Sequence, residues 1–266
     1  MSHRCASVAI VLGMTSCGRI AFDPRPIDDA AHAVPDAMDA AGSTIAYMQS
    51  TPEGRVFPGP SQAVSFGSVP SAGDTIIVDV SAFNANASVT WPPTGVVDDQ
   101  GNTYAVAVAA SDHNAVGYFA DAIYYSTPIG ATAGTFTVTA MPSVASAITM
   151  VAVEYAGLAS ANPVDVTASN TGASANASSG TTAPTAQADE LAVAVLGFTC
   201  NSGTCTVTIP AGYAVRLTEA NSAWENVEAA DAILSTIGTQ SAAWTTGGAG
   251  NSPPDYVACI ATFKAD

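Results

Sequence analysis

The sequence predicts an all-β protein, an antiparallel β-sandwich of jelly-roll-like type. From Ser43 onward, short runs rich in β-branched residues alternate between apolar and polar positions, which is the period of a half-buried strand. Gly, Pro, Asn and Asp cluster between these runs as turn signals. Only 11% of the 266 residues are charged and 48% are hydrophobic, a composition that argues against long surface helices and against disorder.

The predicted strands and turns follow in order along the chain. The runs expected to form strands are 74–80, 103–108, 134–139, 147–155, 190–198 and 256–263. Of these, 147–155 and 190–198 are apolar on both faces, which is typical of central strands. Turns are expected at 91–95, 98–102 and 209–212. Residues 167–185 are almost wholly Ser, Thr, Ala, Gly and Asn, which predicts a long surface connection.

The predicted body, residues 43–266, contains two pseudo-repeats at about 60–157 and 176–266. The matched blocks are Gly73–Phe83 with Ala188–Phe198, Val89–Pro92 with Val207–Pro210, and Ala120–Ile123 with Ala230–Ile233. Two arrangements stay open, a single large sandwich or two tandem immunoglobulin-like sandwiches. In either case we expect matched blocks to take equivalent places in their sheets with the same residues facing the core. Asp121 and Asp231 should then point to the same face.

The N-terminus predicts export. Residues 1–16 carry Arg4 and then the apolar run Ala6–Gly13, which is too short to span a bilayer but fits a secretory signal. Small residues before Cys17 resemble the bacterial lipobox, which implies cleavage before Cys17 and lipidation (diacylglyceryl and palmitate) of this residue. Gly18 after the cysteine favours the outer membrane, by similarity to lipoprotein sorting in Gram-negative bacteria. The alternative is an ordinary signal peptide cleaved near the same place.

Residues 17–42 predict an extended tether, because Asp, Pro and Ala alternate there without apolar periodicity. The expected partner of this segment is the membrane, through the lipid on Cys17. Six basic residues against 22 acidic ones give a net charge of −16, which excludes nucleic-acid binding through a basic surface.

The remaining cysteines fit an exported protein. Cys200 and Cys205 flank a turn rich in Asn, Ser and Gly, which predicts a disulfide that fixes a hairpin. Cys259 lies in a strand-like run and is expected to be a free, buried, small hydrophobic residue.

Two features have a binding interpretation. Asp98, Asp99 and Asn102 place oxygen ligands on a tight loop, as calcium sites do, but the same residues also suit a plain hairpin turn. No other cofactor is expected. Trp224 is the tryptophan expected to be exposed, where it could stack on a sugar ring or a partner, whereas Trp91 and Trp244 are expected in the core.

Catalytic signals are few. The histidines past the signal are His32 in the tether and His113 in a loop, and no Gly-x-Ser-x-Gly motif accompanies them. A glycosidase needs two carboxylates across a cleft. The acids that could supply them are Glu154, Glu225, Glu228 and Asp231. Solvated surface acids are the more common reading in an acidic exported chain, so we expect a protein that is not an enzyme.

Several motifs resemble a β-sandwich module of secreted bacterial surface proteins. They are the strand Gly73–Val78, the hairpin Asp98–Tyr104, the strand Val153–Leu158 and the strand start Ala188–Leu191. The resemblance covers about residues 60–266 and implies architecture and exposure, with no catalytic residues. The expected function is therefore a surface-anchored lipoprotein for binding, adhesion or envelope structure, with a polysaccharide or another surface protein as partner. The alternative is a secreted carbohydrate-active enzyme or carbohydrate-binding module.

Overall fold

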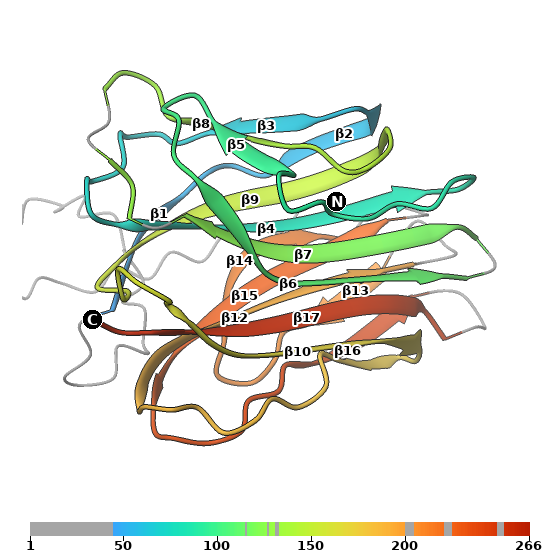
Figure 1. The fold of residues 1–266 in the computed structure, drawn as a ribbon. Coiled ribbons are helices and arrows are strands. Elements are labelled where there is room, and N and C mark those ends of the chain that lie inside the picture. The colour runs from blue at the N-terminus through green and yellow to red at the C-terminus, as the bar shows by residue number, and fades with distance from the viewer. Residues whose placement is uncertain are drawn as a thin grey trace, which may run out of the picture. The chain divides into compact units, whose positions relative to one another are not determined.

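Strands account for every regular element in the described part of the chain. The computed structural model describes residues 45–114, 116–126, 128–130, 133–199, 205–220, 225–248 and 253–266. Within these ranges all elements are β-strands and all strand pairs are antiparallel, so the predicted antiparallel all-β sandwich class is confirmed (Figure 1). In the same ranges no helix is long and apolar enough to cross a membrane.

The first half of the body contains a large and a small sheet. The first large sheet has the order β1-β9-β4-β7-β6, with β2 also paired to β9. Its strands are β1 (Ala46–Ser50), β2 (Gly54–Gly59), β4 (Thr75–Asn84), β6 (Tyr104–His113), β7 (Tyr118–Ser126) and β9 (Ser146–Ala156). The first small sheet has the order β3-β8-β5. Its strands are β3 (Gln62–Ser65), β5 (Val96–Asp98) and β8 (Thr137–Ala140).

The second half is built in the same way. The second large sheet has the order β10-β17-β12-β15-β14, and the second small sheet has the order β11-β16-β13. The large sheet contains β10 (Val164–Ala173), β12 (Asp189–Phe198), β14 (Ala214–Glu219), β15 (Asn226–Ser235) and β17 (Asp255–Lys264). The small sheet contains β11 (Asn176–Ser178), β13 (Cys205–Thr208) and β16 (Ala243–Gly248).

The strand orders of the two halves correspond position by position. In each large sheet the central strand, β4 or β12, lies between the last strand of its half, β9 or β17, and the strand β7 or β15. Two of the three pairs of matched blocks therefore occupy equivalent strands, β4 with β12 and β7 with β15, whereas Val89–Pro92 lies in no strand and its counterpart Val207–Pro210 begins in β13. A duplication as the origin of this order stays a prediction.

The faces taken by the matched residues agree for one pair of blocks only. Asp121 and Asp231 both point away from their own small sheet and toward the opposite large sheet, as expected. Ile76, however, faces the core under the first small sheet, whereas Leu191 faces the core between the large sheets. The prediction of common faces is wrong for these central strands. A one-residue slip in a strand that is apolar on both faces leaves the sequence match almost unchanged, although it reverses every side chain.

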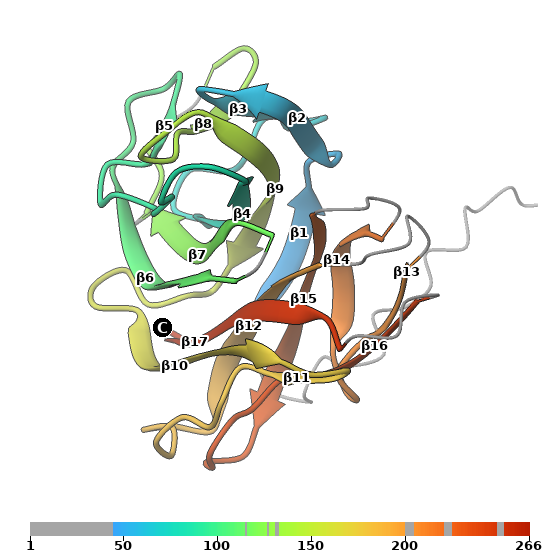
Figure 2. The same ribbon diagram turned by 90° about the vertical axis from the view of Figure 1, so that its right-hand side faces the viewer.

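Three large cores hold the layers of the described body together, with a smaller cluster of Phe83, Phe119, Ala147 and Val257. The first sandwich core lies between the first large and first small sheets, and the second sandwich core lies between their counterparts in the second half. The interface core lies between the two large sheets, where β4, β6 and β7 contact β10, β12 and β17. Figure 2 shows the two sandwiches stacked on each other. Each half thus has its own pair of sheets, as in the tandem alternative, yet one continuous interface core joins them, as in the single-body alternative.

Sequence analysis located the buried strands better than the edge strands. The six predicted runs correspond to β4, β6, β8, β9, β12 and β17. The predicted surface connection at 167–185 is wrong, because β10 and β11 lie within or across this segment and β10 pairs with β17. The second half therefore begins at β10, before residue 176. Most side chains of β10 are exposed or half-buried, so small polar residues suffice at this edge and no apolar pattern marks it.

Candidate functional site

The predicted calcium loop is organised as a hydrogen-bonded hairpin. One oxygen of Asp98 accepts the backbone N–H of Asn102 (3.0 Å), and the other accepts Asn102 Nδ2 (2.8 Å) and the Tyr104 hydroxyl (3.0 Å). Asp99 accepts the N–H of Thr137 on the neighbouring strand (3.1 Å). Among the described residues no three His, Cys, Asp or Glu side chains are placed to hold a metal ion. These hydrogen bonds fit the hairpin role of Asp98, Asp99 and Asn102, and calcium binding by them stays a prediction.

Two of the three tryptophans belong to the cores, as predicted. Trp91 and Trp244 are 6% and 1% exposed. The indole N–H of Trp91 donates to the Ala120 carbonyl (2.9 Å), and that of Trp244 donates to Glu228 Oε1 (3.1 Å). Trp224, the predicted stacking residue, lies outside the described residues.

The cysteine predictions have different outcomes. Cys259 is a free, fully buried thiol in β17, as predicted. Cys205 begins β13 and is buried, but Cys200 lies outside the described residues, so the Cys200–Cys205 disulfide stays a prediction. The proposed lipidation residue Cys17, together with the signal and the tether, also lies outside them.

The four acids considered for glycoside hydrolysis do not form a pair across a cleft. Glu154 is 2% exposed and accepts hydrogen bonds from the Gln49 side chain (2.6 Å) and the Ser71 N–H (2.7 Å). Glu228 and Asp231 are three residues apart on β15 and therefore point to opposite faces of the sheet. Glu225 shares a face with Asp231 but lies six residues away, about 20 Å along an extended chain, whereas a glycosidase pair lies about 5–9.5 Å apart.

His113 is an exposed residue at the end of β6. Its ring stacks on Tyr118 with the ring centroids 4.1 Å apart. Together with Ser111 and Asp112 it lines a shallow cavity of about 240 Å³. These three residues are consecutive on one strand, so alternation turns Asp112 away from its two neighbours. They therefore do not form the chain of hydrogen bonds that a serine nucleophile requires.

The most unusual feature of the body is a row of buried acids between the two large sheets. This acidic seam consists of Asp79 on β4, Asp121 on β7, Asp231 on β15 and Glu225 directly before β15. All four side chains are at most 3% exposed. Burial of an ionised carboxyl is costly unless it is paired and hydrogen-bonded, so the neighbours of each acid decide its charge.

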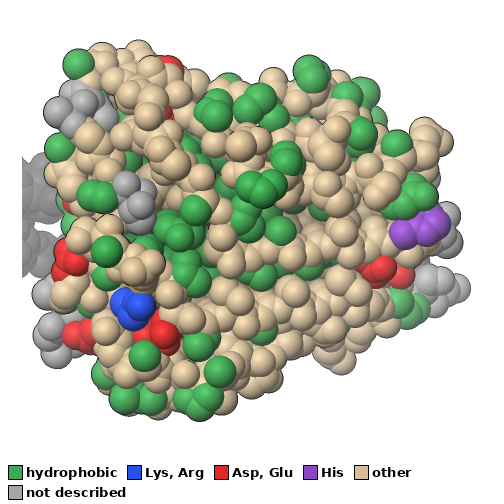
Figure 3. All heavy atoms as spheres, in the orientation of Figure 1, with side chains coloured by type: hydrophobic (Ala, Val, Ile, Leu, Met, Phe, Trp, Pro, Cys, Tyr) green, Lys and Arg blue, Asp and Glu red, His purple; other side chains and the backbone are tan. Residues whose placement is uncertain are grey.

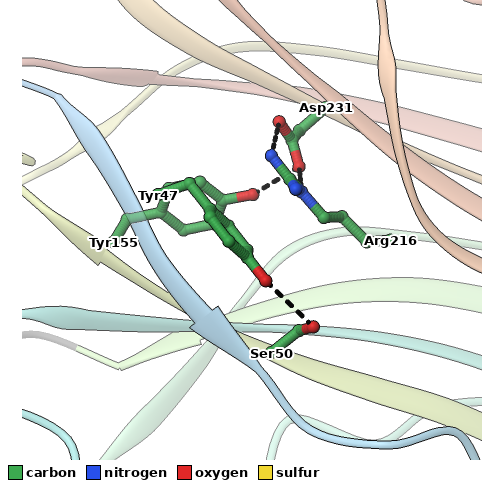
Figure 4. Close-up of polar contacts among 5 residues, drawn as sticks. All are labelled: Tyr47, Ser50, Tyr155, Arg216 and Asp231. Atoms are coloured by element: carbon green, nitrogen blue, oxygen red, sulfur yellow. Dashed lines mark hydrogen bonds and ion pairs between the residues drawn. The ribbon is translucent and has the colours of Figure 1, made fainter. Parts of the chain in front are cut away.

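Asp231 is held by a cation and a phenol. Arg216 of β14 donates to both carboxylate oxygens through Nε and Nη2, and the Tyr155 hydroxyl of β9 donates to Oδ2 (2.6 Å). The Arg216 guanidinium lies 3.7 Å from the centre of the Tyr47 ring, and the Tyr47 hydroxyl donates to Ser50 Oγ (Figure 4). Two tyrosines of the first half, Tyr155 and Tyr47, therefore contact the Arg216–Asp231 ion pair of the second half.

Asp121 is held by the backbone of the opposite sheet. The N–H of Gly197 on β12 donates to Asp121 Oδ2 (2.6 Å), and the Cys259 thiol lies 3.8 Å from the Asp121 carbonyl. A Cβ atom on Gly197 would lie 2.6 Å from Asp121 Oδ1 and 2.8 Å from Ser81 Oγ, so glycine is required for this close approach. The expectation that Asp121 and Asp231 have structural roles as acceptors fits this geometry, with one donor to each, Gly197 and Tyr155, on the opposite half.

Three acids of the seam, Asp79, Asp121 and Glu225, favour the protonated form. Burial raises the pKa of Asp121 to about 7, against the lowering effect of Ser81 and the Gly197 N–H beside it. Burial also raises the pKa of Asp79 well above its usual value, and the neighbouring Asp231 and Asp121 raise it further. Burial raises the pKa of Glu225 to about 8, where the positive charge of Arg55 opposes it. The seam therefore retains protons at a pH at which exposed carboxyls are ionised.

The seam reaches the surface at one margin. There Arg55 of β2 forms an ion pair with Glu219 of β14 at 3.3 Å, with side chains that are 31% and 15% exposed. This pair also links the first half to the second. Asp79 and Arg216 were missed from the sequence, although each had a signal: Asp79 lies inside the run Ile76–Val80, whose other residues are all apolar, and Arg216 is one of only six basic residues in the chain.

An exposed aromatic side chain that sequence analysis also missed lies on β2. Phe57 is 61% exposed and, with Pro58, borders a cavity of about 250 Å³ at one end of the first large sheet. Asn84 orders the opposite wall, because its Nδ2 donates to the Ala145 carbonyl (2.8 Å). Asn86 also lines this cavity. Figure 3 shows one face of the molecule, on which charged side chains are few and scattered.

Comparisons with known proteins find no similar protein. No protein-family model, no curated protein and no solved structure matches the chain.

Proposed function

We propose that the chain is an envelope-anchored lipoprotein whose double β-sandwich binds or adheres to a partner and does not catalyse a reaction. The lipobox-like segment before Cys17 and the acidic tether at 17–42 support anchoring at the outer membrane. The rigid body that follows would be held away from the lipid surface by the tether. A polysaccharide or a second surface protein is the proposed partner.

One observation carries the non-enzymatic part of this proposal. Acids that could act as a catalytic pair are buried inside the body, where Glu228 bonds to Trp244 and Asp231 bonds to Arg216. Two such carboxyls in a hydrolase must reach the same substrate. Their position on opposite faces of one strand instead gives each of them a structural role.

Metabolic labelling tests the anchor. We expect radiolabelled palmitate to be incorporated when the full chain is expressed in a Gram-negative host, and we expect the Cys17→Ala variant to lose the label. Cys5→Ala is the matched control, since this cysteine lies in the predicted signal and its variant should keep the label. Unchanged labelling of Cys17→Ala would show that the protein is not a lipoprotein attached at this residue.

A carbohydrate-binding role is the second candidate, and the exposed Phe57 beside an amide-lined cavity favours it. An aromatic face can stack on a sugar ring while amides such as that of Asn86 bond to its hydroxyls. In affinity electrophoresis through gels that contain soluble polysaccharides, Phe57→Ala should abolish any retardation of the body. Ile237→Ala is the control, because Ile237 is also 61% exposed but lies on the second half. Equal retardation of both variants would exclude this cavity as the binding site.

A further inference from the structure

Specific polar contacts between the two halves converge on the acidic seam. The first half contributes Asp121, which accepts the Gly197 N–H, and Tyr155, which donates to Asp231. These contacts bridge opposite large sheets and are buried in the interface core. The state of the seam therefore affects how firmly one half is held against the other.

The charges that face Asp79 and Asp121 do not balance. The titratable and charged groups around these two carboxyls come from both sheets and from the margin of the interface. They are Asp231, Glu225, Arg216, Tyr155, Cys259, Arg55 and Glu219. Arg216 forms its ion pair with Asp231, and Arg55 forms one with Glu219. Arg216 and Arg55 are thus engaged with other acids, and a negative charge on Asp79 or Asp121 would have no dedicated cation among the described residues.

The hydrogen bonds of Asp79 and Asp121 also favour the uncharged form of both carboxyls. Oδ1 of Asp79 and Oδ1 of Asp121 are buried and have no hydrogen-bond partner among the described residues. An ionised carboxylate in a dry interface needs donors on both oxygens, whereas a protonated carboxyl needs fewer and carries no charge. The packing around Asp79 and Asp121 therefore suits the protonated form.

We propose that Asp79 and Asp121 form a proton-dependent lock between the two sandwiches, closed while both carboxyls are protonated and loosened as they release their protons to solvent. Like charges placed together in a low-dielectric interface repel, and water must enter to solvate them. Separation of the large sheets admits that water, whereas the apolar side chains of each sandwich core keep the sheets within each half together. The lock gives an exported protein a way to respond to the acidity of its surroundings.

Spin-label distance measurements on the full body test the lock. One label is placed on Ser65→Cys of β3 and the other on Thr245→Cys of β16, exposed positions on the small sheets of the two halves. We expect a narrow distance distribution at about pH 5 and a broader, longer one at about pH 8.5, which lies above the raised pKa of Asp121, about 7. The pair Ser65→Cys and Ser111→Cys within the first half should give the same distribution at both pH values.

Variants of the two aspartates test whether their ionisation causes the broadening of the distance distribution between the halves. With Asp79→Asn and Asp121→Asn combined, the distribution between halves should stay narrow at both pH values, because an amide cannot ionise. Asp189→Asn, a half-buried acid at the start of β12 outside the seam, should behave as the unmodified protein. If the double variant does not fold, Asp121→Asn alone should at least halve the broadening. A distribution that is the same at both pH values in the unmodified protein, or one that broadens equally in the Asn variants, would overturn the proposal.

Discussion

The first sandwich core and the interface core are built from opposite faces of the same strands, yet their chemistry differs. On β4 and β7 the side chains that face the first small sheet include no carboxyl group, whereas those that face the second half include Asp79, Ser81 and Asp121. In the sandwich core the polar atoms of Trp91 and Tyr124 each donate to a backbone carbonyl, at 2.9 and 2.5 Å. In the interface core, Oδ1 of Asp79 and Oδ1 of Asp121 have no hydrogen-bond partner among the described residues.

Because of this difference, the first sandwich core stabilises the fold independently of pH, whereas the interface core responds to pH. Burial of apolar area stabilises the first sandwich core in the same way at any pH, because apolar side chains carry no ionisable group. The interface core combines apolar burial with carboxyls whose protonation depends on the medium. Strand alternation allows one strand to serve both roles, since its two faces are chosen independently.

The pH dependence of stability should show the largest effect. Burial raises the pKa of Asp121 from its usual value of 3.8 to about 7, so the folded protein keeps a proton that the unfolded chain has released. Stability is therefore fully present below about pH 4 and is lost as the pH rises toward about 7, by up to ~4 kcal/mol from this residue alone. Urea unfolding at about pH 5 and about pH 8 measures the loss. A free energy of unfolding that rises over this interval would contradict the assignment.

Removal of the cation from the interface should be nearly as costly. Arg216→Met keeps much of the side-chain volume but leaves the Asp231 carboxylate buried without its ion pair. The breaking of a buried pair costs about 3–5 kcal/mol. Chemical denaturation at neutral pH should show this loss, and Arg216→Met combined with Asp231→Leu should recover part of it. A loss below 1 kcal/mol would mean that this pair is effectively solvated.

Truncation of a side chain in the first sandwich core should lower the free energy of unfolding by the same amount at every pH. This independence of pH would distinguish the first sandwich core from the interface core. Ile148 of β9 is fully buried in the first sandwich core. Ile148→Ala should destabilise the protein by about 2–5 kcal/mol through lost burial and the cavity left behind. Unfolding curves at about pH 5 and about pH 8 should give the same difference from the unmodified protein. A strongly pH-dependent difference would show that the two cores are not independent.

A methyl group inserted between the large sheets should have a smaller effect. Gly197→Ala places a Cβ against the Asp121 carboxyl and Ser81 Oγ, and such overpacking costs about 1–3 kcal/mol. Gly238→Ala is the matched control, because a Cβ there meets nothing within 4 Å and its stability should change by less than about 0.5 kcal/mol. Equal thermal stability of the two variants would refute the close approach of β12 to β7.

Local sequence patterns predicted the strands. The acidic seam, in contrast, depends on contacts between residues far apart in the sequence, which such patterns do not show. Alternation and β-branched residues marked β4, β9 and β12, and the repeated Ala-Asp-Ala-Ile blocks marked Asp121 and Asp231. Each of these aspartates, however, meets a partner 76 residues away, Gly197 in one case and Tyr155 in the other. No periodicity within a strand shows which sheet will lie opposite it. The edge strand β10 was missed for a related reason, since an exposed edge needs no apolar pattern.

The protonation state of Asp121 tests the central claim most directly. Protein labelled with ¹³C at the aspartate carboxyls can be titrated by NMR, with the Asp121 resonance assigned by its loss in Asp121→Asn. We predict that this resonance keeps the chemical shift of a protonated carboxyl through the acidic range and reaches its midpoint near pH 7, because the residue is fully buried. A midpoint near the ordinary value of about 4 would contradict the account, because the interface would then hold an ionised carboxylate at every physiological pH.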